Sequence, residues 1–163
     1  MKFAASIFLL ARLLLAPSGG ASAQAAVAAV LDDWHAAAAA ADEPRYFKHF
    51  APDAVFLGTD GSERWTLEEF RRYAHPYFGM GRAWTFKPSG RHISISRDGA
   101  VAWFDEALDT PNLGPARGSG VLVRIKGVWK IAHYNLSVPI PNGLLKEFKE
   151  RIETHSKSAS PAR

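Results

Sequence analysis

Asp105 is the carboxylate of this sequence with the strongest case for acid–base chemistry. It stands beside Glu106 in the strand-like run VAWFDEALDT. Neighbouring side chains of a strand point to opposite faces, so one of the two carboxylates must face the concave side of a curved sheet. A carboxylate in an apolar cavity has a raised pKa and can serve as a general acid or base.

His133 is the second candidate for proton transfer. Residues 117–142 hold two β-branched, aromatic-rich runs around Lys126-Gly127, a pattern that predicts a hairpin with a two-residue turn. The period of two places on one face of the second strand the residues Trp129, Ile131, His133 and Asn135. Counting from the turn puts Gly120 opposite His133 and Gly118 opposite Asn135. The two missing side chains would leave room for a ligand.

These candidates admit both a catalytic and a structural interpretation. Asp105 or His133 could act as the base that moves a proton next to a carbonyl, with Asn135 or a tyrosine donating to the oxyanion. Asp105 could instead pair with Arg117. If Asp98-Gly99 is a turn, His92 lies opposite Asp105 across the strands. His133 could equally be a structural histidine with satisfied hydrogen bonds.

No motif for a metal, a phosphate or a nucleophile accompanies these residues. The six histidines form no HxH or HExxH spacing, and neither a glycine-rich phosphate loop nor a GxSxG elbow occurs. The chain has no cysteine, which excludes a thiol nucleophile and thiolate ligands. We therefore expect no metal and no cofactor. Asp60, Glu63 and Arg64 follow a strand end and could rim a pocket.

The order of the predicted elements is helices first and antiparallel strands afterwards. A long helix is expected over residues 24–41, a short one from Pro44, and a third after the capping box Thr66-x-x-Glu69. Strands are expected over residues 54–58, 83–96 (interrupted at 88–90) and 101–108, followed by the hairpin. An amphipathic helix follows Asn142, and residues 154–163 should be disordered. This order predicts an α+β fold.

Large aromatic residues are spaced so that they could face the space between the helices and the sheet. We expect a ligand-binding wall from this group, with Arg117 and Asn135 as its polar members. The aromatic members are Trp34, Tyr46, Phe56, Trp103 and Trp129.

The segments GTDGSERWT, VAWFDEAL, RGSGVL and GVWKIAHYNLSVPIPN together resemble the SnoaL-like branch of the nuclear transport factor 2 superfamily. The resemblance covers residues 24–142. It implies a cone-shaped, strongly curved antiparallel sheet wrapped around N-terminal helices. Ketosteroid isomerases, polyketide cyclases, dehydratases and non-catalytic binding or assembly domains all share this fold, so the resemblance does not choose a function.

The N-terminus reads as a secretory signal over residues 1–23, with Ala21-Ser22-Ala23 as the cleavage site, although Arg12 interrupts its apolar run. We therefore expect a secreted or periplasmic protein with one domain over residues 24–153. The formal charge of +4 includes Lys2 and Arg12. Basic residues form no stripe, which argues against nucleic acid as a partner, and no membrane attachment is expected after cleavage.

We expect the mature domain to bind a small hydrophobic or amphipathic molecule in its cone. A cofactor-independent isomerase, dehydratase or cyclase using Asp105 and His133 is the alternative, and a dimeric assembly domain is the second alternative. Apolar residues alternate with the presumed pocket residues and would need cover on the outer sheet face: Phe104, Leu108, Tyr134 and Leu136. This pattern predicts a homodimer packed sheet to sheet, burying roughly 800 Å² per subunit.

Overall fold

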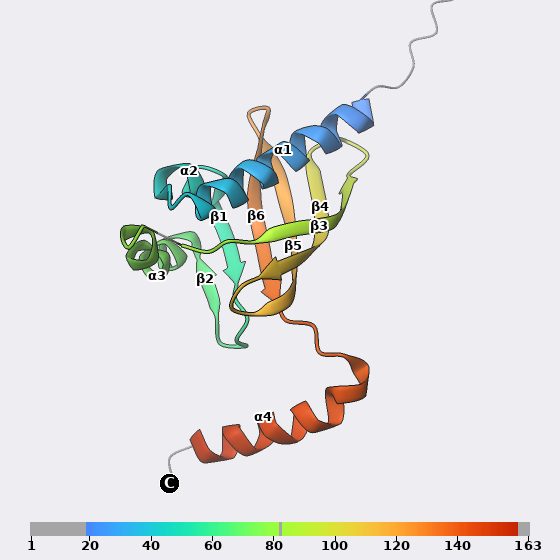
Figure 1. Cartoon of the computed structure of the whole chain (residues 1–163). Helices are drawn as coiled ribbons and strands as arrows, with labels where there is room; N and C mark the ends of the chain where they lie inside the picture. Colours follow the sequence, from blue (N-terminus) through green and yellow to red (C-terminus); the bar gives the residue numbers. More distant parts are fainter. Residues whose placement is uncertain (1–18, 82, 160–163) are drawn as a thin grey trace, which may run out of the picture.

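The computed structural model describes residues 19–81 and 83–159, which form one curved sheet with helices on its concave side (Figure 1). The long helix α1 crosses this side of the sheet, and α3 lies beside the edge strand β2. The helices are α1 Gly19–Ala39, α2 Glu43–Phe47, α3 Leu67–Gly79, the 3-10 turn η1 Asn142–Leu144 and α4 Leu145–Ala159. The predicted α+β class and the helix-filled curved sheet are confirmed.

Six strands form the sheet in the order β2-β1-β6-β5-β4-β3. They are β1 Phe50–Leu57, β2 Arg64–Thr66, β3 Lys87–Ile95, β4 Val101–Thr110, β5 Gly114–Ile125 and β6 Val128–Ser137. All neighbouring pairs are antiparallel except β1 and β6, which run parallel, a pairing that the sequence did not indicate. The expected interruption of β3 is present as a register shift between Ser89 and His92.

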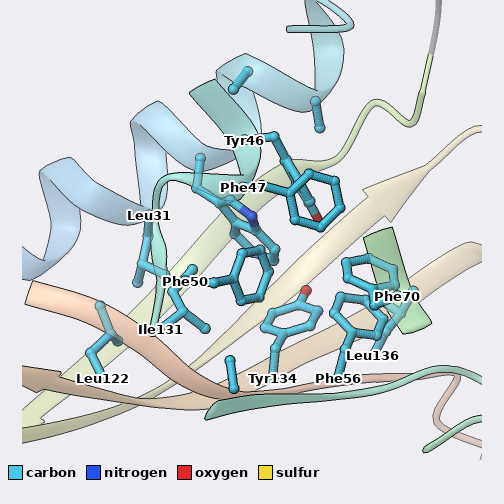
Figure 2. Close-up of a cluster of buried hydrophobic side chains, with 14 of the residues drawn as sticks. Leu31, Tyr46, Phe47, Phe50, Phe56, Phe70, Leu122, Ile131, Tyr134 and Leu136 are labelled. Atoms are coloured by element: carbon cyan, nitrogen blue, oxygen red, sulfur yellow. The ribbon is translucent and has the colours of Figure 1, made fainter. Parts of the chain in front are cut away.

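The core is built around Trp34 of α1. Its ring lies 4.7 Å from that of Tyr134 on β6 and 5.2 Å from that of Tyr46 on α2, measured between centroids. Phe50 packs edge-on at 5.7 Å. Aromatic pairs at these separations contribute beyond the area that they bury, so this cluster fixes α1 and α2 against the sheet (Figure 2).

The third helix starts as its sequence predicts. The Thr66 side chain accepts from the backbone of Glu69, and the Glu69 carboxylate accepts from the backbone N–H of Thr66 at 2.8 Å. Trp65 and Phe70 pack at 5.9 Å between ring centroids, as a hydrophobic staple requires. The apolar face of α3 is thereby held toward the sheet.

The β5–β6 hairpin turns at Lys126 and Gly127, both with positive φ, as predicted. The register then shifts: Leu122 pairs with Ile131, whereas Val121 pairs with His133. Ala132 is therefore an extra residue, a β-bulge, and a bulge reverses the faces that follow it. Beyond the bulge, Tyr134 and Leu136 point into the core, while His133 and Asn135 point to the outer face.

The C-terminal helix α4 runs to Ala159, past Thr154 where disorder was expected, and extends away from the sheet (Figure 1). Its apolar residues Leu145, Phe148 and Ile152 are exposed by 50%, 39% and 57%. No helix in the described part of the chain has the length and apolar character to span a membrane. Most of the predicted signal peptide, residues 1–18, lies outside the described residues.

Candidate functional site

A cavity of about 760 Å³ opens at one end of the cone, between α3, β2, residues 83–86 and the β4–β5 loop. Its wall is rich in aromatic residues, which come from both helix and strand. They are Phe56, Trp65, Phe70, Tyr73, Tyr77, Trp84 and Phe86. A cavity of this size suits a small organic molecule.

Four of these rings form a continuous arc along one wall. Tyr73 and Tyr77 are one helical turn apart on α3, so both face the same way. Trp65 stacks on Tyr73 with 4.7 Å between centroids and 21° between planes. Tyr77 lies 5.5 Å from Tyr73 and 6.5 Å from Trp84. We call Trp65, Tyr73, Tyr77 and Trp84 the aromatic arc.

Polar groups line the cavity sparsely. Thr59, Thr85, Thr110 and Asn112 offer hydroxyl and amide groups, and Glu63 carries the one charge among the described lining residues. Glu63 folds back over Gly58, where an added Cβ would overlap its carboxylate. Its Oε2 accepts from the backbone N–H of Asp60 at 3.0 Å. The carboxylate is thus held in a defined position at the cavity.

The Tyr73 phenol shares this environment. Burial, the neighbouring Tyr77 and the Glu63 carboxylate together raise the pKa of Tyr73 to about 12. The phenol of Tyr73 is therefore neutral at physiological pH.

A second polar group lies deeper, between α1 and the sheet. Glu106 of β4 is 1% exposed. Its Oε1 lies 2.7 Å from His35 Nε2, and its Oε2 accepts from Arg91 Nε at 2.6 Å. Arg91 Nη1 donates to the Asp32 carboxylate at 2.7 Å and to the Ala28 carbonyl at 3.2 Å. We call His35, Arg91 and Glu106 the buried polar network, and the exposed Asp32 borders it at the surface.

Tyr134 adjoins this network. Its hydroxyl is buried without a hydrogen-bond partner and lies over Gly118, where a Cβ would come within 2.6 Å of it. Burial and the nearby Glu106 carboxylate raise the pKa of Tyr134 well above its usual range. Phe56, whose ring centroid is 5.2 Å from that of Tyr134, lines the cavity and separates the two regions.

The structure brings one of the sequence-predicted ligand residues, Phe56, into the cavity wall. Trp34 and Tyr46 are each 1% exposed and fill the core instead. Trp129 is buried under the Arg124 guanidinium, 6.0 Å away, and does not line the cavity. The predicted ligand contacts of Trp34 and Tyr46 were wrong because their rings pack on each other and on neighbouring rings in the core, and that of Trp129 was wrong because Trp129 packs against Arg124.

The remaining predicted site residues lie on the outer face of the sheet. Asp105 and Trp103 alternate with the inward Phe104 and Glu106, so the concave side takes Glu106 and not Asp105. Arg117 is exposed on β5 opposite Ala107. His133 and Asn135 are turned outward by the bulge at Ala132 described above.

The catalytic assignment of Asp105 and His133 is therefore wrong in its geometry, since neither lines the cavity. The predicted pairing of Asp105 with His92 is confirmed, with 3.3 Å between Oδ1 and Nδ1. Both side chains are exposed, by 59% and 79%, so solvent screens the contact.

The glycines of β5 pair differently from the prediction, Gly120 with Tyr134 and Gly118 with Leu136. The Tyr134 side chain and the Phe104 ring occupy the space that we expected to be empty. The residues assigned to an outer dimer face are also inward: Phe104, Leu108, Tyr134 and Leu136 are all buried in the core. Helices cover them, because α1 and α2 pack on this side of the sheet.

The sequence analysis did not identify most of the residues that line the cavity. The spacing of four residues on a predicted helix could have placed Tyr73 and Tyr77 on the same face. Trp65 was already recognised as a hydrophobic-staple residue. The prediction that Glu63 rims a pocket is confirmed, whereas Asp60 and Arg64 do not line it. In the described part of the chain, no three acidic or imidazole side chains gather closely enough to hold a metal ion.

The curved sheet, the helix across its concave side and a cavity at its open end define the nuclear transport factor 2-like class of cone folds. The SnoaL-like domain family matches residues 27–141, and the chain belongs to this family. Its members include small-molecule-binding and isomerase- or dehydratase-type proteins. No curated protein matches the chain.

Solved structures show the same fold at low identity. A nuclear transport factor 2-like protein of unknown function from Pseudomonas putida KT2440 is 17% identical, with a TM-score of 0.65 over 75% of this chain and 90% of that one. A candidate dehydratase from Streptomyces avermitilis is 13% identical (TM-score 0.64; 75% and 99% covered). A candidate ketosteroid isomerase from Shewanella frigidimarina NCIMB 400 is 20% identical (TM-score 0.58; 71% and 97% covered).

Proposed function

We propose that this protein binds a small amphipathic molecule with a large apolar body in the cavity beside α3. The observation that carries the proposal is the cavity of about 760 Å³, whose wall is mostly apolar and rich in aromatic residues. Ligand sites of a few hundred cubic ångströms combine apolar walls with few, well-placed polar groups. Here those groups are Glu63, Thr85, Thr110 and Asn112.

Binding without turnover fits the chemistry of the lining better than catalysis does. An acid–base reaction needs a titratable group within hydrogen-bond reach of the reacting proton. Asp105 and His133 are on the far side of the sheet, and the described lining holds no imidazole. Glu63 lies at the cavity, but its carboxylate is already engaged by the Asp60 backbone N–H.

A proton-transferring enzyme remains the second candidate, on different residues from those the sequence suggested. Its support is Tyr134, whose hydroxyl is buried and unpartnered beside Glu106. Such an enzyme requires the Phe56 ring to move so that a substrate oxygen reaches Tyr134. Turnover of a ketone panel that falls at least a hundredfold in Tyr134→Phe, with unchanged ligand affinity, would favour it over simple binding.

Retention of a ligand during purification is the direct test of binding. Native mass spectrometry of protein from its own host should show a bound small molecule that is released on denaturation. Thr85→Trp fills the cavity with an indole and should abolish retention. Ser94→Trp, an equally exposed polar residue on the outer sheet face, is the matched control and should retain the ligand. Equal retention by both variants would contradict the proposal.

We also propose that the protein is exported, on the strength of the small residues at 21–23 after an apolar N-terminal run. The intact mass of chain recovered from the periplasm or medium of the native host should correspond to a start near Gln24. Recovery only from the cytosol with residue 1 or 2 at the N-terminus would contradict export.

A further inference from the structure

The cavity differs in charge from the rest of the molecule. The chain as a whole is basic, with 20 Lys and Arg against 16 Asp and Glu. Among the described residues that line the cavity, however, the single charged side chain is Glu63, and no lysine, arginine or histidine is present. Arg64, the next residue in the chain, is exposed and does not line it. The charge that the described lining residues carry is therefore negative.

The aromatic arc adds a second source of attraction for positive charge. The faces of indole and phenol rings carry partial negative charge, and they hold ammonium groups within about 6 Å of the ring centre. Trp65, Tyr73, Tyr77 and Trp84 offer four such rings along one wall. Phe rings, which line the deeper part at Phe56 and Phe70, serve better for an uncharged apolar body.

Glu63 and the aromatic arc line the same cavity. Within the arc, Tyr73 stacks directly on Trp65. The carboxylate is held over Gly58 by a hydrogen bond from the Asp60 backbone N–H. A carboxylate that lines the same cavity as several electron-rich rings favours an organic cation, since the two attractions add in a partly desolvated space.

We propose that the ligand of this cavity is an amphipathic organic cation, with an amine or quaternary ammonium head. The head lies between Glu63 and the Trp65–Tyr73 pair, and the apolar body extends toward Phe56, Phe70 and Leu136. This inference rests on the proposed binding function and specifies the ligand class. A carboxylate ligand of the same size would meet repulsion from Glu63, and no described lining residue carries a positive charge to offset it.

Three probes of similar size separate charge from shape: phenethyltrimethylammonium, the neutral ketone 4-phenylbutan-2-one and the anion 3-phenylpropanoate. Isothermal titration calorimetry of the full mature chain should give a Kd for the cation at least about tenfold below that of the ketone. The anion should bind more weakly than either. Glu63→Gln should weaken cation binding about tenfold and leave ketone binding unchanged.

Glu68→Gln is the matched control, because Glu68 pairs with Arg72 on the exposed side of α3, away from the cavity. It should leave all three affinities as they are. Equal affinity for cation and ketone, or an equal loss for both in Glu63→Gln, overturns the cation preference and leaves cavity binding intact. No detectable binding of any probe overturns the proposed function as well.

Discussion

Glu106 and His35 meet in the protein interior, with 2.7 Å between Oε1 and Nε2, and join strand β4 to helix α1. Arg91 Nε donates to the other oxygen of the same carboxylate, Glu106 Oε2, at 2.6 Å. A buried carboxylate with partners on both oxygens is expensive to disturb, because loss of one member leaves the others desolvated and unpaired.

Glu106→Ala should therefore lower the free energy of unfolding by about 3–5 kcal/mol. Asp105→Ala, at the neighbouring but exposed position, should change it by less than about 0.5 kcal/mol. Urea unfolding followed by circular dichroism measures both. A similar decrease in the free energy of unfolding for the two variants would mean that the buried polar network does not hold α1 on the sheet.

Stability should fall in acid through a cluster at the α1–α2 junction. Arg45 and His49 hydrogen-bond to Asp33 and hold the pKa of that carboxyl well below its usual 3.8, despite the opposing effect of burial. Burial lowers the pKa of His49 from 6.5, although Asp33 opposes this shift. As the pH falls, each group binds its proton at a higher pH in the unfolded chain than in the folded protein. The free energy of unfolding therefore decreases below about pH 6.5 through His49 and below about pH 4 through Asp33.

Asp33→Asn isolates the carboxyl contribution. The variant should be less stable than the parent at pH 7, and the gap should narrow from about pH 5 toward pH 2, because the unfolded parent chain protonates Asp33 first. Unfolding free energies measured at several pH values give the gap directly. A gap that stays constant over this range would show that the ionised form of Asp33 contributes nothing to folding.

Gly120 should be intolerant of a side chain. A Cβ there would overlap the His133 carbonyl, which is backbone and cannot turn away, and would press on the Phe104 ring. Gly120→Ala should cost about 1–3 kcal/mol of unfolding free energy. Gly143→Ala, where a Cβ meets open space, provides the comparison and should be within about 0.5 kcal/mol of the parent. Thermal unfolding of the two variants decides the point.

The homodimer stays a prediction, now on different residues. The outer sheet face carries Trp103, which is 50% exposed, and the half-buried Val121 and Val123. Analytical ultracentrifugation at micromolar concentration should give a dimer that Trp103→Glu dissociates. Met80→Glu, at an exposed residue of the cavity mouth, should leave it intact. A parent chain that sediments as a monomer would exclude this interface.

The sequence predicted the fold class, the capping box of α3 and the turn of the last hairpin, because each depends on local residue chemistry. It misplaced His133 and Asn135 because one extra residue at Ala132 reverses every later side chain, and a count from the turn assumes regular pairing. The strand alternation groups Phe104, Glu106 and Leu108 on one face of β4, and in the structure this face is the covered one. Which side α1 covers is a tertiary fact that strand periodicity does not contain.

The cavity was less predictable than the core because its wall joins several segments that are separate in the sequence. Trp65, Tyr73 and Trp84 are far in the sequence from Asp105 and His133, the strand residues with candidate acid–base chemistry. Aromatic spacing identified rings on the inner side, but it could not separate Trp34, which packs in the core, from Trp84, which borders the cavity. That distinction depends on how closely neighbouring rings approach.

The central claim, that ligand enters the aromatic cavity and not the outer face, is tested most directly by the indole N–H signals of the five tryptophans in a ¹H–¹⁵N spectrum. Titration with phenethyltrimethylammonium should shift the signals of Trp65 and Trp84 and leave those of Trp103 and Trp129 in place. A shift confined to Trp103, or no shift of Trp65 and Trp84 at saturating probe, would contradict it.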